Sequence, residues 1–162
     1  AHKPSLIFLD EPTVAVDPQS RNHILEGIKK LNEQGATIVY TTHYMEEVEL
    51  LCHEIVIMDK GRVIARGTND ELKNKISLGE KITIVLNQKE EELISLLKAD
   101  QQVISIQEEN LTLHIAYQGK GNHLADLIDV LRESNIQYQT LFSERPTLND
   151  VFLELTGKQL RD

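Results

Sequence analysis

The sequence predicts an α/β protein in two parts, a parallel sheet with a hairpin followed by a smaller α+β domain. Two observations carry this prediction. Residues 6–9 and 36–40 are short apolar runs of the kind that form buried parallel strands, and a helical pattern lies between them. The second half of the chain has the element order βαββαβ, which is the ferredoxin-like order. We therefore expect two domains, residues 1–78 and 79–162, with the boundary near residues 77–80.

The first helix is marked by signals at both of its ends. Asp17 is a good N-cap residue, Pro18 follows at the first helical position, and Gly35 ends the apolar periodicity. A second helix is expected after the second strand, with an apolar face formed by Met45, Val48, Leu51 and Cys52. Strand, helix and strand in this order form a βαβ unit, which requires a parallel sheet.

The end of the first part reads as a β-hairpin. Residues 54–58 and 62–65 are two strand-like runs around Asp59, Lys60 and Gly61. Lys-Gly at the tip indicates a tight turn. A short polar helix is expected over residues 70–75.

In the second part, each predicted element is a short apolar pattern between polar turns. The expected strands cover residues 82–86, 103–107, 111–117 and 137–142, and the expected helices cover residues 89–98 and 124–133. A closing helix follows, in which Thr147 and Asp150 have the spacing of a capping box. Val151, Phe152 and Leu155 give that helix its apolar face.

Composition bounds the classes of function. With 162 residues, 40% hydrophobic, the chain can bury a core, and its net charge of −9 argues against nucleic acid as a partner. Cys52 is the only cysteine, which suits a reducing compartment, and its apolar neighbours favour a buried structural thiol. No apolar run reaches the roughly 20 residues of a membrane span.

The most informative stretch is the first strand and the acids that follow it. Asp10 and Glu11 emerge at the C-terminal end of the apolar run 6–9, where open α/β sheets bind their ligands. Because neighbouring strand residues point to opposite faces, we expect different roles for the two carboxylates. One can hold hydrated Mg²⁺ while the other faces an attacking water. Taken alone, Asp-Glu-Pro would more simply end a strand in a solvated turn.

The order and spacing of four motifs resemble the nucleotide-binding domains of ABC transporters. Residues 6–11 resemble the Walker B motif, and Val14-Ala15-Val16-Asp17 resembles the D-loop. Thr41-Thr42-His43 resembles the switch or H-loop, and residues 62–68 resemble the hairpin strand and Gly-Thr turn that end the ATPase core. The resemblance implies a RecA-like P-loop NTPase core, of which residues 1–78 would be the C-terminal part.

This resemblance also implies roles for four residues. Asp10 would be the carboxylate associated with Mg²⁺, through a water molecule, and Glu11 would be the general base. His43 would contact the γ-phosphate of ATP and help to position the water, and Asp17 would lie where two ATPase domains meet. The cofactors implied are ATP and Mg²⁺, and the reaction is ATP hydrolysis.

Several motifs of that family are missing from the sequence. It contains no G-x-x-x-x-G-K-[ST] run, no signature Ser-Gly-Gly and no Q-loop. The family places all three before Walker B, and the chain begins at Ala1 directly before the first strand. We therefore expect a C-terminal fragment that is inactive alone, since nothing would hold the triphosphate. The sheet would also lack a neighbouring strand, and an open strand edge favours a dimer or higher oligomer.

Residues 146–157 resemble the closing segment of the ABC class that exports drugs, polysaccharides or ions through separate membrane subunits. This resemblance implies an exporter, with transmembrane permease subunits and a second ATPase subunit as partners, on the cytoplasmic face of the membrane. The sequence departs from the family at His53-Glu54, where relatives often have Asp-Arg, and at Asn69, where Pro is common.

Two other functions stay open at this point. The ferredoxin-like half could be a ligand-binding or dimerisation module through which the chain acts by itself, because fold alone does not assign a function. The chain could also come from a soluble ABC ATPase that works on ribosomes or in DNA repair. The acidic composition and the closing segment argue against this last reading.

Overall fold

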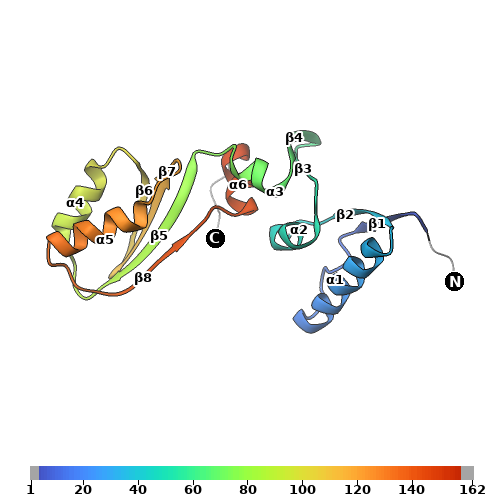
Figure 1. The fold of residues 1–162 in the computed structure, drawn as a ribbon, viewed down its shortest axis with the longest axis horizontal. Coiled ribbons are helices and arrows are strands. Elements are labelled where there is room, and N and C mark those ends of the chain that lie inside the picture. The colour runs from blue at the N-terminus through green and yellow to red at the C-terminus, as the bar shows by residue number, and fades with distance from the viewer. Residues whose placement is uncertain (1–3, 158–162) are drawn as a thin grey trace. The chain divides into compact units, whose positions relative to one another are not determined.

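A computed structural model describes residues 4–157, which form an α/β protein (Figure 1). Contacts within the chain divide it into two units, residues 1–72 and 73–162. From the sequence, we placed this division between residues 78 and 79. Those residues instead belong to a strand of the second unit, so the division comes earlier than expected.

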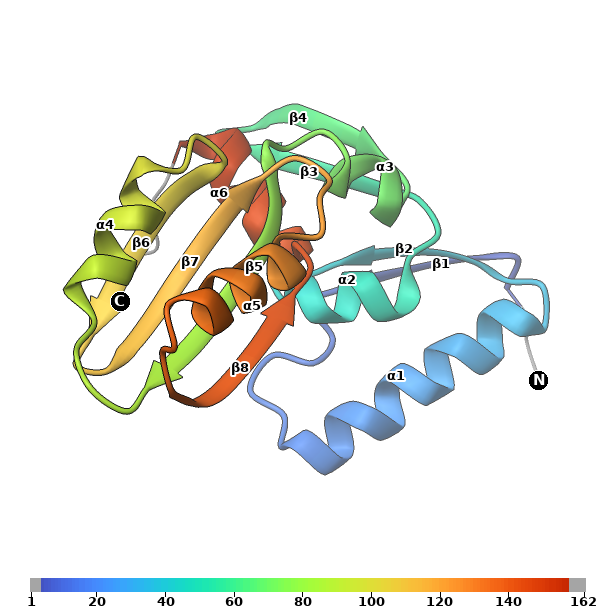
Figure 2. The ribbon, with the colours of Figure 1, turned by 60° about the vertical axis from the view of Figure 1, so that its left-hand side comes forward.

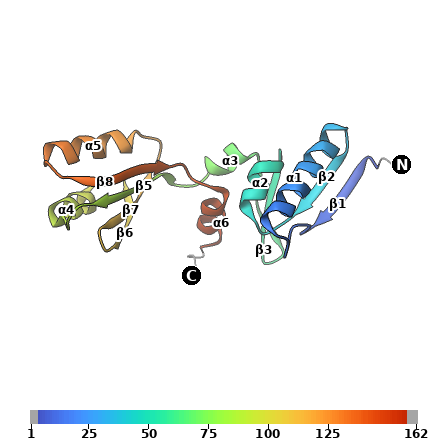
Figure 3. The ribbon, with the colours of Figure 1, turned by 90° about the horizontal axis from the view of Figure 1, so that it is seen from below.

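The first unit begins with a βαβ motif. It consists of β1 (Leu6–Asp10), α1 (Pro18–Glu33) and β2 (Thr37–Thr41), and Figure 3 follows the chain through these three elements. β1 and β2 pair in parallel, with Asp10 beside Thr41 in the register. The predicted parallel pairing is therefore confirmed, and the C-terminal ends of both strands meet at one edge.

The signals read at the ends of α1 are confirmed. Asp17 is the N-cap, its side chain accepts from backbone N–H groups of the first turn, and Pro18 is the first residue of the helix. Gly35 follows the helix with a φ of 95°, a conformation that glycine adopts without strain. Leu25 and Ile28 are the buried residues of α1.

The next helix, α2 (Met45–Leu51), differs from its prediction. The four residues expected to form its apolar face are only partly buried: Met45, Val48, Leu51 and Cys52. The buried side chain of this helix is that of Glu47, which is 1% exposed. A carboxylate is buried only where hydrogen-bond donors compensate for its lost hydration, so its neighbours are of interest.

The predicted hairpin is confirmed. β3 (Ile55–Asp59) and β4 (Arg62–Gly67) pair antiparallel, and α3 (Asn69–Lys73) follows them. Lys60 and Gly61 at the tip have φ angles of 49° and 73°. Two consecutive positive φ angles are the mark of a type I′ turn, whose twist matches that of the flanking strands.

The second unit contains a four-stranded antiparallel sheet and two helices in the predicted order βαββαβ. The strand order in the sheet is β6-β7-β5-β8. The elements are β5 (Leu78–Leu86), α4 (Glu91–Ala99), β6 (Val103–Glu109), β7 (Thr112–Gln118), α5 (His123–Glu133) and β8 (Tyr138–Glu144).

Helices α4 and α5 lie on the same side of this sheet (Figure 2). Alternate residues of the central strands point to that side, which is why they are buried while their neighbours are not. The core between sheet and helices includes Ile82, Ile84, Leu86, Leu93, Leu97, Leu113, Ile115, Leu127 and Leu131. It is one continuous hydrophobic cluster that belongs to the second unit alone.

The residues at the expected domain boundary, 77–80, are tied into the sheet. The backbone N–H of Gly119 donates to the carbonyl oxygen of Ser77 at 2.9 Å. A Cβ atom on Gly79 would lie 1.5 Å from the carbonyl oxygen of Gly119, so the two backbones approach too closely for any side chain. Close backbone packing therefore continues through the expected boundary at residues 77–80.

The last element is α6 (Leu148–Thr156), which begins with the predicted capping box between Thr147 and Asp150. Nζ of Lys81 also lies 3.0 Å from Oδ2 of Asp150, so β5 and the start of α6 are joined by an ion pair. Gly157 ends the helix with a φ of 64°. Across residues 4–157, none of the helices has the length and apolar character needed to cross a bilayer.

Candidate functional site

Asp10 is the last residue of β1, at the edge where both parallel strands end. The hydroxyl group of Thr41 on β2 donates a hydrogen bond to Oδ1 of Asp10. The carboxylate therefore has a fixed position at the C-terminal end of the sheet, which is where α/β proteins bind their ligands.

Glu11 lies just beyond the strand, in a left-handed backbone conformation with a φ of 44°. Its backbone N–H donates to the carbonyl oxygen of Thr41 at 2.9 Å. We expected alternation along a strand to separate Asp10 from Glu11, but β1 ends at Asp10 and the turn separates them instead. A positive φ is uncommon for a residue other than glycine and is often found at functional sites.

His43 lies beside Glu11. Its Nδ1 atom is 3.2 Å from Oε1 of Glu11, and the side chains are 58% and 47% exposed. The contact joins residues from the turns that follow β1 and β2. A carboxylate and an imidazole are thus brought together at the sheet edge, open to solvent and to a ligand.

Asp17, also expected at the site, serves as the cap of α1. Its Oδ1 atom accepts hydrogen bonds from the backbone N–H groups of Gln19 and Ser20, both at 3.0 Å. A hydrogen bond from the side chain of Ser20, followed by these backbone bonds, lowers the pKa of Asp17. Val16, the residue before this cap, is held by a hydrogen bond from its N–H to the carbonyl oxygen of Thr13.

The turns that carry the exposed pair both bond to a buried carboxylate, that of Glu47. Four side chains donate hydrogen bonds to it: Thr13 Oγ1 at 2.7 Å, Arg21 Nε at 2.7 Å, Tyr40 Oη at 2.7 Å and Thr42 Oγ1 at 3.0 Å. Burial alone would raise the pKa of Glu47, but these bonds outweigh burial and lower it. Burial of the Tyr40 phenol, together with its hydrogen bond to Glu47, raises the pKa of Tyr40 to about 12.

Sequence reasoning missed Glu47 because Glu46-Glu47 reads as the solvated first turn of a helix. Glu46 does fit that reading, with a side chain that is 90% exposed. A signal was nonetheless present, since Glu47 stands four residues before Leu51 and therefore on the expected apolar face. A carboxylate at such a position requires donors from neighbouring elements.

The residues at the C-terminal edge of the β1–β2 sheet could supply only part of the ligand shell of a magnesium ion. Over residues 4–157 there is no group of three or more His, Cys, Asp or Glu side chains arranged to hold a metal. Mg²⁺ in nucleotide sites commonly uses one or two carboxylates, and substrate phosphates and waters complete its shell. Asp10, as a single fixed carboxylate, fits that kind of shared site.

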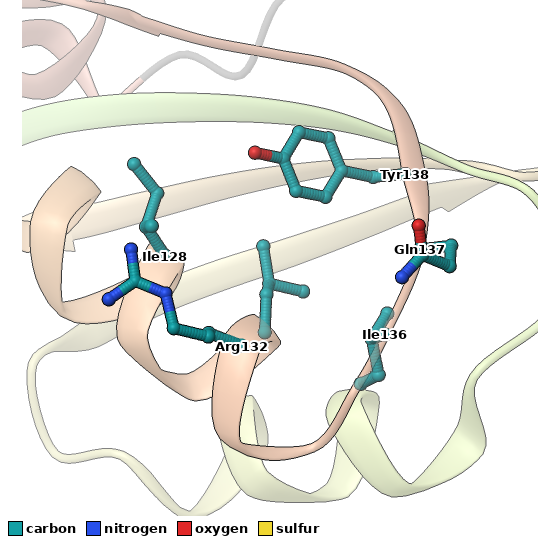
Figure 4. A pocket seen from close by; sticks show the side chains of 6 residues that line it. Ile128, Arg132, Ile136, Gln137 and Tyr138 are labelled. Atoms are coloured by element: carbon teal, nitrogen blue, oxygen red, sulfur yellow. The ribbon is translucent and has the colours of Figure 1, made fainter.

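The second unit has a shallow hollow of its own, shown in Figure 4. It measures about 410 Å³ and lies where α5 turns into β8. Its lining is Ile128, Leu131, Arg132, Ile136, Gln137 and Tyr138. The ring of Tyr138 extends from β8 toward the helix that carries Ile128 and Arg132.

Comparison with known proteins places this chain in a family. Residues 67–156, more than half of the chain, match the family model of the C-terminal domain of DrrA1-3-like ATP-binding proteins. The chain belongs to this family. The resemblance to ATP-binding proteins of ABC transporters, stated from the sequence motifs, is thereby confirmed.

Curated relatives agree with this family. The chain is 40% identical to the linearmycin resistance ATP-binding protein LnrL of Bacillus subtilis, covering 99% of this chain and 52% of that protein. It is 33% identical to the daunorubicin resistance ATP-binding protein DrrA3 of Streptomyces coeruleorubidus, over 98% of this chain and 50% of that protein. A Nod factor export ATP-binding protein I of Cupriavidus metallidurans is 35% identical, with 98% and 50% covered.

The chain thus spans about half the length of the curated relatives it matches. Because the alignment with each relative covers nearly all of this chain, it includes both the site edge and the second unit.

Proposed function

We propose that this chain is the part of an ABC exporter's ATP-binding subunit that supplies the hydrolytic carboxylate and histidine. The observation that carries the proposal is the contact of 3.2 Å between Nδ1 of His43 and Oε1 of Glu11 at the end of two parallel strands. The family and the names of its relatives, which are ATP-binding proteins of resistance and export, support it.

In the proposed reaction, Glu11 accepts a proton from the water that attacks the γ-phosphate of ATP. A base placed beside the nucleophile contributes about 10²–10⁴-fold to such a step. His43, held beside Glu11, can donate a hydrogen bond to the transferring phosphoryl group and keep the carboxylate oriented. Both side chains are exposed, as they must be to meet a substrate that arrives from solution.

Asp10 would hold Mg²⁺, through water, in this proposal. The ion supplies charge neutralisation for the phosphate oxygens when it is bound. Thr41 keeps the Asp10 carboxylate at the strand end. Asp17 would lie at the contact with a second ATPase subunit, and its role as a helix cap would fix the shape of that D-loop.

The proposed architecture has two parts. The first unit would be the C-terminal part of a RecA-like P-loop NTPase core, supported by its parallel β1–β2 pair and the hairpin that follows. The second unit would be ferredoxin-like, supported by its antiparallel sheet of order β6-β7-β5-β8. This second unit would be an accessory domain of the ATPase subunit.

The partners proposed for the complete subunit are transmembrane permease subunits and a second copy of the ATPase subunit. Its place would be the cytoplasmic face of the membrane. The relatives named for drug resistance and Nod factor export favour export as the direction of transport. Nucleic acid is not among the proposed partners, given the net charge of −9.

The chain by itself is proposed to be inactive, because its sequence has no phosphate-binding loop. The test is a calorimetric titration of MgATP into this chain and into the subunit extended through the polypeptide that precedes Ala1. We expect binding to the extended protein only. Tight binding to the short chain would contradict the proposal and direct attention to the second unit.

A second function is favoured by the hollow beside α5. With three apolar and three polar side chains in its lining, it could hold a small ligand, and the chain would then act as a binding module. A screen for compounds that raise the melting temperature of the chain without nucleotide tests this alternative. Loss of such an effect in Tyr138→Ala would locate the ligand in the hollow.

A further inference from the structure

Glu47 connects four separate segments of the first unit. Thr13 belongs to the turn after β1, Arg21 to α1, Tyr40 to β2 and Thr42 to the turn after β2, and the side chains of all four donate to its carboxylate. Oε1 accepts from the first two and Oε2 from the last two. A single buried group thus bridges the turn that carries Glu11 and the turn that carries His43.

On the Glu11 side, the connection runs through the turn itself. Thr13 is 3% exposed, and its hydroxyl group donates to Oε1 of Glu47 at 2.7 Å. The backbone N–H of Val14 donates to the carbonyl oxygen of Glu11 at 3.2 Å, which closes the turn. The left-handed conformation of Glu11 is therefore anchored two residues later by a bond to Glu47.

On the His43 side, two contacts meet. Thr42 donates to Oε2 of Glu47 and accepts from the backbone N–H of Tyr44 at 3.0 Å, which fixes the backbone on both sides of His43. The guanidinium of Arg21, held by Glu47, lies 5.0 Å from the ring centre of Tyr44. The ring of Tyr44 is in turn 4.2 Å from that of His43.

We infer that Glu47 is a positioning residue that sets the distance between Glu11 and His43 by holding both of their turns. This inference rests on the proposed function, because it assigns Glu47 to the hydrolytic site. Glu47 itself is 1% exposed, so its carboxylate is closed to a substrate that arrives from solution. Its effect on the reaction would come from geometry, since small misplacements of catalytic groups cost large factors in rate.

The test uses the complete subunit and the substitution Glu47→Gln. Glutamine keeps the shape of the side chain, but its NH₂ group cannot accept, so at least one pair of donors loses its acceptor. We expect kcat for ATP hydrolysis to fall about 10–100-fold while KM for ATP stays within about twofold of wild type. Glu46→Gln is the matched control, because Glu46 is exposed and only approaches Arg21 at 3.7 Å. Equal kcat in the two variants would overturn the inference.

If Glu47→Gln fails to fold, a second pair of variants, at Thr13, tests the same inference. Thr13→Val removes the hydroxyl donor at similar size, and Thr13→Ser keeps it. We expect kcat to fall in Thr13→Val and to return toward the wild-type value in Thr13→Ser. Two variants with the same kcat would count against a role through Glu47.

A readout without ATP separates this inference from the proposed function. In the nucleotide-free subunit labelled with ¹⁵N at histidine, we expect Glu47→Gln to shift the imidazole signal of His43 and Glu46→Gln to leave it in place. An unmoved signal in Glu47→Gln would overturn the positioning role. If Glu47→Gln shifts the signal but the wild-type subunit does not hydrolyse ATP, the positioning role would be supported and the proposed function would be contradicted.

Discussion

Oη of Tyr40 lies 2.7 Å from Oε2 of Glu47, so two ionisable groups of the first unit share one hydrogen bond. The bond favours the ionised carboxylate and the neutral phenol together. It lowers the pKa of Glu47 against the effect of burial, and it adds to the burial that raises the pKa of Tyr40 to about 12. The stability of the chain should therefore depend on pH at both ends of the scale.

At alkaline pH, the wild-type chain should lose stability through Tyr40. The folded pKa lies above the ordinary value of 10.0, so the contribution is complete below pH 10 and is lost as pH rises toward 12. Tyr40→Phe should be less stable than wild type at pH 8 by about 1–3 kcal/mol, because Glu47 loses a donor. This difference should narrow above pH 10. Urea unfolding at pH 8 and pH 11 measures it.

The matched control for the alkaline experiment is Tyr138→Phe, because Tyr138 is 41% exposed. Its difference from wild type should be small and should stay nearly constant between pH 8 and pH 11. A Tyr40→Phe difference that also stayed constant over this range would refute the assigned role of the phenol.

At acid pH, protonation of Asp150 in the second unit should lower the stability of the chain. Burial raises the pKa of Asp150, but the hydrogen bonds from Thr147 and Lys81 outweigh burial and lower it. Its contribution to stability is present above pH 3.8 and is lost as pH falls through the lower folded value. Asp150→Asn should cost about 1–2 kcal/mol at pH 7, since it breaks a capping box and an ion pair, and less at pH 3.

The control for Asp150 is Asp129→Asn on α5. Asp129 is 67% exposed and pairs with Arg132 at 3.5 Å within the same helix, an interaction of little worth in solvent. Thermal unfolding of both variants at pH 7 should separate them clearly. Similar melting temperatures would show that the capping box and the Lys81 pair contribute nothing measurable.

The close approach of Gly79 to Gly119 predicts that alanine at Gly79 destabilises the chain, whereas alanine at an uncrowded glycine stabilises it. Gly79→Ala should destabilise the chain by about 1–3 kcal/mol, because the new Cβ would overlap a carbonyl oxygen and one backbone would have to move. Gly27→Ala is the control. Gly27 lies inside α1 with open space around it, so alanine there should stabilise the chain by about 0.5–1 kcal/mol. Urea unfolding of the two variants checks both signs, and a neutral Gly79→Ala would contradict the close approach.

Local signals in the sequence predicted the elements of the fold well. Asp17, Pro18 and Gly35 marked the ends of α1, and Thr147 with Asp150 marked the start of α6. Such signals succeed because capping and turn geometry depend on a few adjacent residues. The packing of Gly79 against Gly119 could not be predicted from local signals, because the two residues lie forty positions apart in the chain.

The candidate site was predicted in part. Asp10, Glu11 and His43 were named from motifs, and the structure brings Glu11 and His43 together while Asp10 bonds to Thr41. Glu47 escaped because its burial depends on donors from four segments, and local periodicity carries no information about such tertiary partners. Asp17 was expected at the site, and its observed contacts are those of a helix cap.

The role proposed for Glu11 makes the most direct prediction about activity. In the complete subunit, Glu11→Gln removes the proton acceptor but keeps the size of the side chain and a hydrogen-bonding contact with His43. ATP should therefore bind nearly as in wild type, while turnover should fall about 10²–10⁴-fold. Calorimetry measures the binding, and phosphate release under saturating MgATP measures the turnover.

The control for Glu11→Gln is Glu26→Gln. Glu26 is an exposed residue of α1, so this substitution removes a negative charge at a position outside the sheet edge. Its turnover should match wild type. If Glu11→Gln also turned over at the wild-type rate, the general base would have to be another group. If it lost ATP binding as well, Glu11 would serve to hold the nucleotide, because a pure base contributes to the transition state and leaves ground-state affinity unchanged.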